Sequence, residues 1–168
     1  IGRGRLPQRP ITPYLEEFPK HGVSFEYNNT MPFSTNGKLT GGKFYVDGGI
    51  SSQFITGLLF ALPLLEEDSE IILTSHLESK PYVDITLGAL REHGCQVAET
   101  ENGYLVKGGQ HYMPFSGRVE GDYSQAAFFK VANSLGSDID IAGLSEKSFQ
   151  GDKKIVEICE KIVYNKNG

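Results

Sequence analysis

Serine hydroxyl groups occur at two places in this sequence where they could bind an anion. Ser51 and Ser52 follow a Gly-Gly pair and precede apolar residues at helical spacing, and Ser79 precedes Lys80-Pro81 and a second such run. The first turn of a helix carries free backbone N–H groups and the positive end of the helix dipole, which favour an anion such as phosphate. Serine hydroxyls there add donors. The alternative is simple N-capping, because serine is a common N-cap residue.

Three arginine residues, Arg3, Arg5 and Arg9, lie in a Gly- and Pro-rich segment just before a predicted helix. Guanidinium groups bind phosphate or carboxylate through paired hydrogen bonds. The alternative is a solvent-exposed basic turn. The sequence contains no Ser-His-Asp pattern, phosphate-binding P-loop or dinucleotide fingerprint, and its scattered histidines predict no metal site. The residues alone therefore predict an α/β protein that binds a phosphorylated anion, without naming a reaction.

Composition and charge exclude several classes of protein. The net charge of −5 over 168 residues argues against a nucleic-acid interface, which needs clustered Lys and Arg. The longest apolar stretch, residues 54–65, is interrupted by Gly57 and Pro63 and is too short to span a bilayer. Cys95 and Cys159 show no metal-type spacing, and we expect two reduced, buried thiols in the cytoplasm.

The order of the elements can be predicted from periodicity and turn residues. An alternating segment at 43–47 ends at a Gly-Gly turn, which is typical of a strand. Helical spacing follows to about residue 62, and residues 69–75 form the next predicted strand. A second helix extends to about Glu92 and ends at His93-Gly94. Asn102-Gly103 then predicts a hairpin between 96–99 and 104–107.

The sequence repeats itself at a constant interval. Val46-Asp47-Gly48-x-x-Ser51 recurs as Val119-Glu120-Gly121-x-x-Ser124, and at the same interval Val83-Asp84-Ile85 recurs as Val156-Glu157-Ile158. Similar helices and strands in the same order would be the chance explanation. We predict a β-α-β-α-β-β unit, with the tail of one unit at 1–43, a complete unit at 44–117 and half of a third at 118–168. A half unit leaves an apolar helix face and a sheet edge uncovered, so we expect the natural protein to continue beyond both ends.

Several motifs together resemble those of one enzyme family. They are Gly48-x-x-Ser51-Ser52-Gln53-Phe54-x-Thr56, Ser79-Lys80-Pro81-Tyr82-Val83-Asp84-Ile85-Thr86-Leu87, Lys107-Gly108-Gly109-Gln110, Val119-Glu120-Gly121-Asp122-x-Ser124 and Gln150-Gly151-Asp152. In this order they resemble the signatures of the EPSP synthases, which are enolpyruvyl transferases. The resemblance covers essentially the whole chain. It implies an α/β fold, an inside-out barrel of six β-α-β-α-β-β units in two domains, with 1–120 in the N-terminal domain and 121–168 beginning the second.

The resemblance also implies roles for particular residues. Ser51, Ser52 and Ser79 would hold the phosphate of shikimate 3-phosphate, and Tyr82 would contact this substrate. Gln53 would lie between the shikimate ring and phosphoenolpyruvate. Arg9 would bind the phosphate of phosphoenolpyruvate. The implied reaction transfers the enolpyruvyl group to the shikimate 5-hydroxyl and releases phosphate, without a cofactor, in a monomeric cytoplasmic enzyme.

The catalytic residues of such enzymes are expected outside this chain. The resemblance places the essential lysine before residue 1 and the acid–base residues beyond residue 168, so we expect no catalytic residue within the chain and no turnover by the chain alone. Two alternatives stay open. One is the sister enzyme that uses UDP-N-acetylglucosamine, although its typical cysteine is absent from residues 3–8. The other is a non-enzymatic phosphate-binding module.

Overall fold

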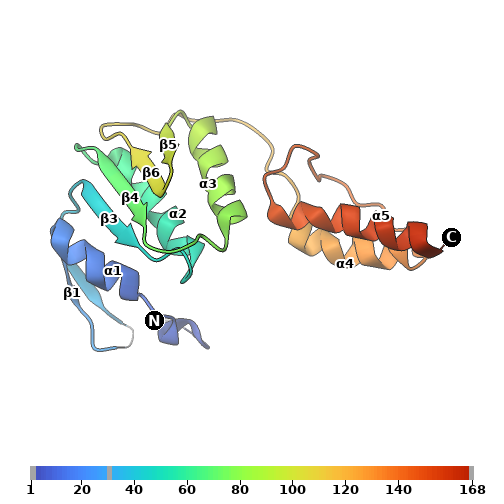
Figure 1. Cartoon of the computed structure of the whole chain (residues 1–168), viewed down its shortest axis with the longest axis horizontal. Coiled ribbons are helices and arrows are strands. Elements are labelled where there is room, and N and C mark those ends of the chain that lie inside the picture. Colours follow the sequence, from blue (N-terminus) through green and yellow to red (C-terminus); the bar gives the residue numbers. More distant parts are fainter. Residues whose placement is uncertain (1–2, 30–31, 167–168) are drawn as a thin grey trace. The chain divides into compact units, whose positions relative to one another are not determined.

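A four-stranded sheet lies at the centre of the first part of the chain in the computed structural model, which describes residues 3–29 and 32–166 (Figure 1). Its strands follow the order β3 (Gly42–Val46), β4 (Ser69–Leu73), β6 (Gly103–Val106) and β5 (Val97–Thr100). Strands β3 and β4 are parallel, whereas β6 is antiparallel to both β4 and β5. The predicted strands and hairpin are confirmed, but the turn lies at Glu101-Asn102, one residue before the predicted Asn102-Gly103, because Gly103 already pairs with Thr100.

Two helices connect and cover these strands. Helix α2 (Ser52–Ala61) leads through the short helix η3 (Leu62–Leu64) from β3 to β4, and α3 (Lys80–Glu92) leads from β4 to β5. Helix α3 ends as predicted, because Gly94 has a φ of 80° that favours glycine. None of the helices that the structure describes combines the length and apolar character needed to cross a membrane.

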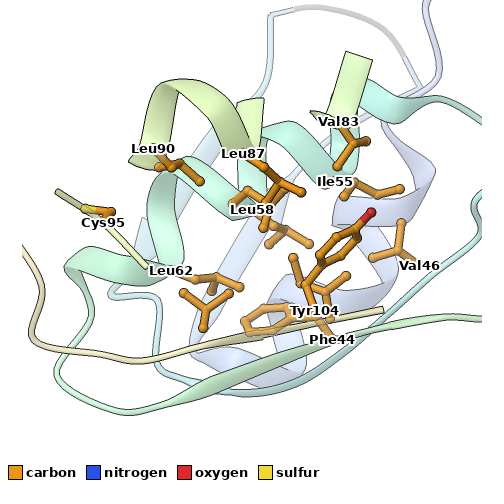
Figure 2. Packing of buried hydrophobic residues seen from close by; sticks show 13 residues of the cluster. Phe44, Val46, Ile55, Leu58, Leu62, Val83, Leu87, Leu90, Cys95 and Tyr104 are labelled. Atoms are coloured by element: carbon orange, nitrogen blue, oxygen red, sulfur yellow. The ribbon is translucent and has the colours of Figure 1, made fainter. Parts of the chain in front are cut away.

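The hydrophobic core lies between the sheet and the two helices (Figure 2). Phe44, Ile71 and Tyr104 come from neighbouring strands at the same level of the sheet, with Ile71 paired to both of the others. Leu58 from α2 and Leu90 from α3 are completely buried against this face. Burying a leucine side chain contributes about 1.5–3 kcal/mol, so this packing holds the two helices against the sheet.

The segment before β3 contains a helix followed by two strands, which is the order expected for the tail of a β-α-β-α-β-β unit. It contains η1 (Leu6–Gln8), α1 (Thr12–Glu17), η2 (Phe18–His21) and a separate two-stranded sheet of β1 (Val23–Glu26) and β2 (Ser34–Gly37).

Two buried side chains of this segment cover the free edge of β3. Glu17 Oε2 accepts a hydrogen bond from the Tyr45 N–H at 2.8 Å, and His21 Nε2 lies 3.0 Å from the Lys43 carbonyl oxygen. These contacts satisfy backbone groups that an edge strand otherwise exposes.

The chain divides into two compact units, residues 1–114 and 115–168. The second contains α4 (Tyr123–Ser134), η4 (Gly151–Lys154) and α5 (Ile155–Lys166), at positions that match the sequence repeat. The strands expected in this half unit are not formed among its described residues. The Gly121 N–H donates a backbone hydrogen bond to the Gly143 carbonyl oxygen at 2.7 Å, but no ladder of such bonds follows among the described residues. A strand needs neighbouring strands to complete its pairing. Cys95 and Cys159 are both buried free thiols, as predicted.

A candidate anion site at two helix N-termini

Helices α2 and α3 both begin at the same edge of the sheet. Strands β3 and β4 are parallel and paired in register, with Val46 opposite Leu73, so the loops that follow them leave the sheet side by side. The loops are residues 47–51 and 74–79. Helices α2 and α3 pack together below the loops, and Thr56 and Thr86 place their hydroxyl oxygens 3.1 Å apart. The two helix N-termini therefore present their free N–H groups to one region.

The three predicted serines lie at these two N-termini. Ser51 is the N-cap residue of α2, and its Oγ accepts a hydrogen bond from the Gln53 N–H at 3.3 Å. Ser79 is the N-cap residue of α3, but its side chain makes no capping hydrogen bond. Ser52 is only 8% exposed, and its hydroxyl has no partner in the described part of the chain. Capping therefore explains Ser51 and leaves the hydroxyls of Ser52 and Ser79 available to a ligand.

Gln53 and Tyr82 lie next to these serines in the first turns of α2 and α3. Both side chains are exposed, Tyr82 to 56%, and within the described residues neither makes a side-chain hydrogen bond. An exposed tyrosine on a helix N-terminus offers an aromatic face and a hydroxyl to a bound molecule. The structure thus brings together the five residues that were predicted to contact shikimate 3-phosphate.

Arg9 lies between η1 and α1, and the structure shows no direct contact between it and the serines. Its side chain is exposed and makes no hydrogen bond or ion pair with the described residues. The helix that follows it is attached to α2, because the Tyr14 hydroxyl donates to the Phe54 carbonyl at 3.0 Å and the two rings meet edge to face at 4.9 Å. The described contacts therefore connect the segment that carries Arg9 to the helix that carries the serine pair.

A cavity of about 420 Å³ lies beside the candidate site, on the side of the β5–β6 hairpin. Its lining includes Lys80, Glu99 and Glu101, but none of the predicted serines. Lys80 is neutralised by Asp84 at 2.6 Å and Glu99 at 3.3 Å, and the hydrogen bond to Asp84 raises the pKa of Lys80. With its carboxylates, this cavity is poorly suited to a phosphate, so the open helix N-termini remain the better candidate.

The second unit shows what the equivalent serine does when an anion is next to it. The interval of the repeat that relates Ser51 to Ser124 also relates Ser79 to Asp152. The Ser124 hydroxyl donates a hydrogen bond to Asp152 Oδ2 at 2.5 Å. The second unit therefore pairs this hydroxyl with its own carboxylate, whereas the first unit has an uncharged Ser79 at the position of Asp152.

The sequence did not predict a role for two residues of the site region, Asp47 and Ser75. Asp47 and Ser75 join the two loops through a hydrogen bond from the Ser75 hydroxyl to Asp47 Oδ1. The sequence repeat contained the signal, because it aligns these residues with Glu120 and Ser148, but the chemical meaning of that alignment required the contact itself.

Comparison with known proteins identifies the family. The family model described as EPSP synthase (3-phosphoshikimate 1-carboxyvinyltransferase) matches residues 1–165. Curated proteins named 3-phosphoshikimate 1-carboxyvinyltransferase are similar over nearly the whole chain. The one from Clostridium perfringens (strain ATCC 13124) is 48% identical over 162 residues, and the one from Clostridioides difficile (strain 630) is 45% identical over 164. These matches cover 95% and 96% of this chain, and the chain spans about 38% of the length of each relative.

A solved structure supports the same fold. The EPSP synthase of Acinetobacter baumannii superimposes with a TM-score of 0.71 over 95% of this chain and 36% of its own, at 20% sequence identity. The mixed α/β fold of this chain is thus an incomplete EPSP synthase fold. With a family model that matches all but its last three residues, the chain belongs to the EPSP synthase family.

Proposed function

We propose that this chain supplies the shikimate 3-phosphate-binding part of an enzyme that transfers the enolpyruvyl group of phosphoenolpyruvate to the shikimate 5-hydroxyl and releases phosphate. The observation that carries the proposal is the pair of hydroxyls, Ser52 and Ser79, at two adjacent helix N-termini, neither of which has a partner among the described residues. The contact between Ser124 and Asp152 supports it, because there the residue equivalent to Ser51 donates to an anion.

In this proposal the residues of the chain bind and orient the substrates. Ser51, Ser52 and Ser79 donate hydrogen bonds to the substrate phosphate, assisted by the dipoles of α2 and α3. Tyr82 packs against the substrate, and Gln53 lies between the shikimate ring and phosphoenolpyruvate. Such positioning lowers the barrier by removing orientational freedom before reaction.

Arg9 would neutralise the phosphate of phosphoenolpyruvate, which leaves when the tetrahedral intermediate collapses. The intermediate forms when the 5-hydroxyl oxygen bonds to C2 and a proton is added to C3. The groups that move these protons are proposed to lie outside this chain. A mixture of both substrates with the purified chain should therefore release no phosphate. The monomeric state of the whole protein and its place in the cytoplasm stay predictions.

An amide NMR titration of the chain with shikimate 3-phosphate tests the proposed site. Saturable shifts are expected at residues 51–53, 79 and 82. Ser52→Ala and Ser79→Ala should each weaken binding about tenfold or more, because a hydrogen bond to a charged group contributes about 1.5–3 kcal/mol. Ser34→Ala, an exposed change on β2, is the control and should leave the affinity unchanged.

Other ligands separate the alternatives. Shifts with UDP-N-acetylglucosamine instead would favour the sister enzyme. Equal affinity for inorganic phosphate and shikimate 3-phosphate would favour a non-enzymatic phosphate-binding module. A folded chain that responds to none of these ligands would leave helix capping as the role of the serines.

A further inference from the structure

Asp47 connects the two loops that carry the candidate site. It follows β3 directly, and its Oδ1 accepts hydrogen bonds from the Gly49 N–H at 2.8 Å and from the Ser75 hydroxyl. Ser75 comes from the loop after β4, and its Oγ also accepts from the Gly49 N–H at 3.2 Å. One carboxylate therefore holds the turn that leads to Ser51 against the loop that leads to Ser79.

Close backbone packing strengthens this connection. A Cβ atom at Gly48 would lie 2.9 Å from the His76 carbonyl oxygen and 3.0 Å from the Leu77 Cα. The two loops therefore touch at a position that only glycine allows. Asp47 and Gly49, which both bond to the Ser75 hydroxyl, flank Gly48 in the sequence. These hydrogen bonds therefore help to determine how the turn at 48–50 packs on the neighbouring loop.

The same pair recurs in the second unit, at the interval of the sequence repeat. Glu120 Oε1 accepts a hydrogen bond from the Ser148 hydroxyl at 2.7 Å and from Gln150 Nε2 at 2.9 Å. The carboxylate and the serine are separated by 28 residues in both units. In the second unit the site itself is different, because Asp152 replaces the serine at its position. The carboxylate–serine hydrogen bond is thus present in both units, although only the first has a serine at the position of Asp152. The bond is therefore a feature of the loop structure and does not require the anion site.

Charge alone would make Asp47 unfavourable at this place. The hydrogen bond from Ser75, together with that from Gly49, lowers the pKa of Asp47, so the side chain stays ionised. An ionised carboxylate near a phosphate site repels the ligand. Its contribution must therefore come from the hydrogen bonds it accepts. Consecutive glycines such as Gly48-Gly49 lose much conformational freedom when they become ordered, and a loop that is already ordered spares the ligand that cost.

We propose that Asp47 and Ser75 are positioning residues that fix the turn before α2, so that Ser51 and Ser52 already have in the free protein the orientation in which they bind the substrate phosphate. The proposal rests on the proposed function for the identity of the ligand. It makes a prediction of sign: removal of the carboxylate should weaken binding, whereas simple electrostatics predicts that binding becomes tighter.

The test compares Asp47→Ala with Asp47→Asn in the complete 168-residue chain. The amide oxygen of asparagine can accept the same hydrogen bonds without the charge. We expect Asp47→Ala to raise the Kd for shikimate 3-phosphate about tenfold and Asp47→Asn to restore most of the affinity. Glu78→Ala, which removes an exposed carboxylate beside Ser79, is the matched control for charge and should not weaken binding.

A second measurement does not depend on the ligand. Backbone amide relaxation of the free chain should show greater mobility at residues 48–53 in Asp47→Ala, with β3 and β4 unchanged. A turn as rigid as in the wild type, or tighter binding by Asp47→Ala, would overturn the proposal. A turn that loosens in a chain whose wild type does not bind shikimate 3-phosphate would support the positioning role and count against the proposed function.

Discussion

The phenolic oxygen of Tyr14 lies 3.0 Å from the Phe54 carbonyl oxygen and donates a hydrogen bond to it, which attaches α1 to the first turns of α2. The same hydroxyl lies over Gly57, where a Cβ atom would collide with it. The hydroxyl thus fills a space that exists because residue 57 has no side chain. This relationship connects the segment that follows Arg9 to the helix that begins at the serine pair.

Gly57→Ala should destabilise the first unit, and Tyr14→Phe should reduce the damage. An inserted methyl group that must displace its neighbours costs about 1–3 kcal/mol. Removal of the phenolic oxygen leaves the ring carbon 3.4 Å from the new methyl, which is an ordinary contact. A urea titration that follows amide signals of residues 42–106 should give a double-mutant coupling of about 1 kcal/mol or more. Additive effects of the two changes would contradict this packing.

Tyr14 should also give the first unit a stability that falls at alkaline pH. Burial raises the pKa of Tyr14 to about 12, above its ordinary value of 10. The folded state therefore holds the phenolic proton more tightly than the unfolded state, and its stabilising effect is complete below pH 10 and lost as the pH rises towards 12. Unfolding free energies of wild type and Tyr14→Phe should differ less at pH 11 than at pH 8. A difference that is constant with pH would be the contrary result.

Ser79→Asp should imitate the second unit and fill the candidate site with an internal anion. Asp152 occupies the equivalent position there and accepts a hydrogen bond from Ser124. The new carboxylate would compete for the same donors and repel a phosphate, so the Kd for shikimate 3-phosphate should rise by about a hundredfold or more. Calorimetry can measure this loss.

Ser79→Asn has nearly the same shape as Ser79→Asp without the charge, and it is the control for that prediction. It should weaken binding clearly less than Ser79→Asp. Similar losses in the two variants would show that side-chain size, and not charge, determines the effect.

His21→Ala should destabilise the first unit by about 2–4 kcal/mol. The buried ring stacks on Phe44 with the ring centroids 3.8 Å apart, and its nitrogens lie 3.2 and 3.0 Å from the Gly41 and Lys43 carbonyl oxygens. His21→Phe keeps the stacking and loses the hydrogen bonds, so its effect should be intermediate. The exposed His111 provides the control, because His111→Ala should cost less than about 0.5 kcal/mol.

Local sequence patterns predicted most of the elements of the first unit. Alternation at 43–47, helical spacing after Ser51 and the Asn102-Gly103 signal identified strands, helices and a hairpin that the structure confirms, with the hairpin turn one residue earlier than predicted. Simple N-capping was the alternative considered for the serines, and Ser51 is the N-cap residue of α2. These features depend on the conformations of a few consecutive residues, which is why residue order alone indicates them.

Such local patterns could not predict hydrogen bonds between residues that are far apart in the sequence. The hydrogen bonds between Asp47 and Ser75, and between Glu17 and the Tyr45 N–H, each join residues 28 positions apart. Their formation depends on how the strands and helices pack. In the second unit a local pattern predicted a strand that is not formed. The sequence around Val119 repeats the strand pattern of the first unit, but no strand forms among the described residues there. A strand is stable only when a neighbouring backbone pairs with it.

The sequence by itself determined the order of the helices and strands, the internal repeat and the residue types at the helix N-termini, because these are set by local conformation and composition. Only the tertiary structure decided which hydroxyls are already used. Ser51 caps a helix and Ser124 donates to a carboxylate, whereas Ser52 and Ser79 have no partner within the described chain. A hydrogen bond requires two groups at about 3 Å, and that distance exists only after the sheet and its helices have packed.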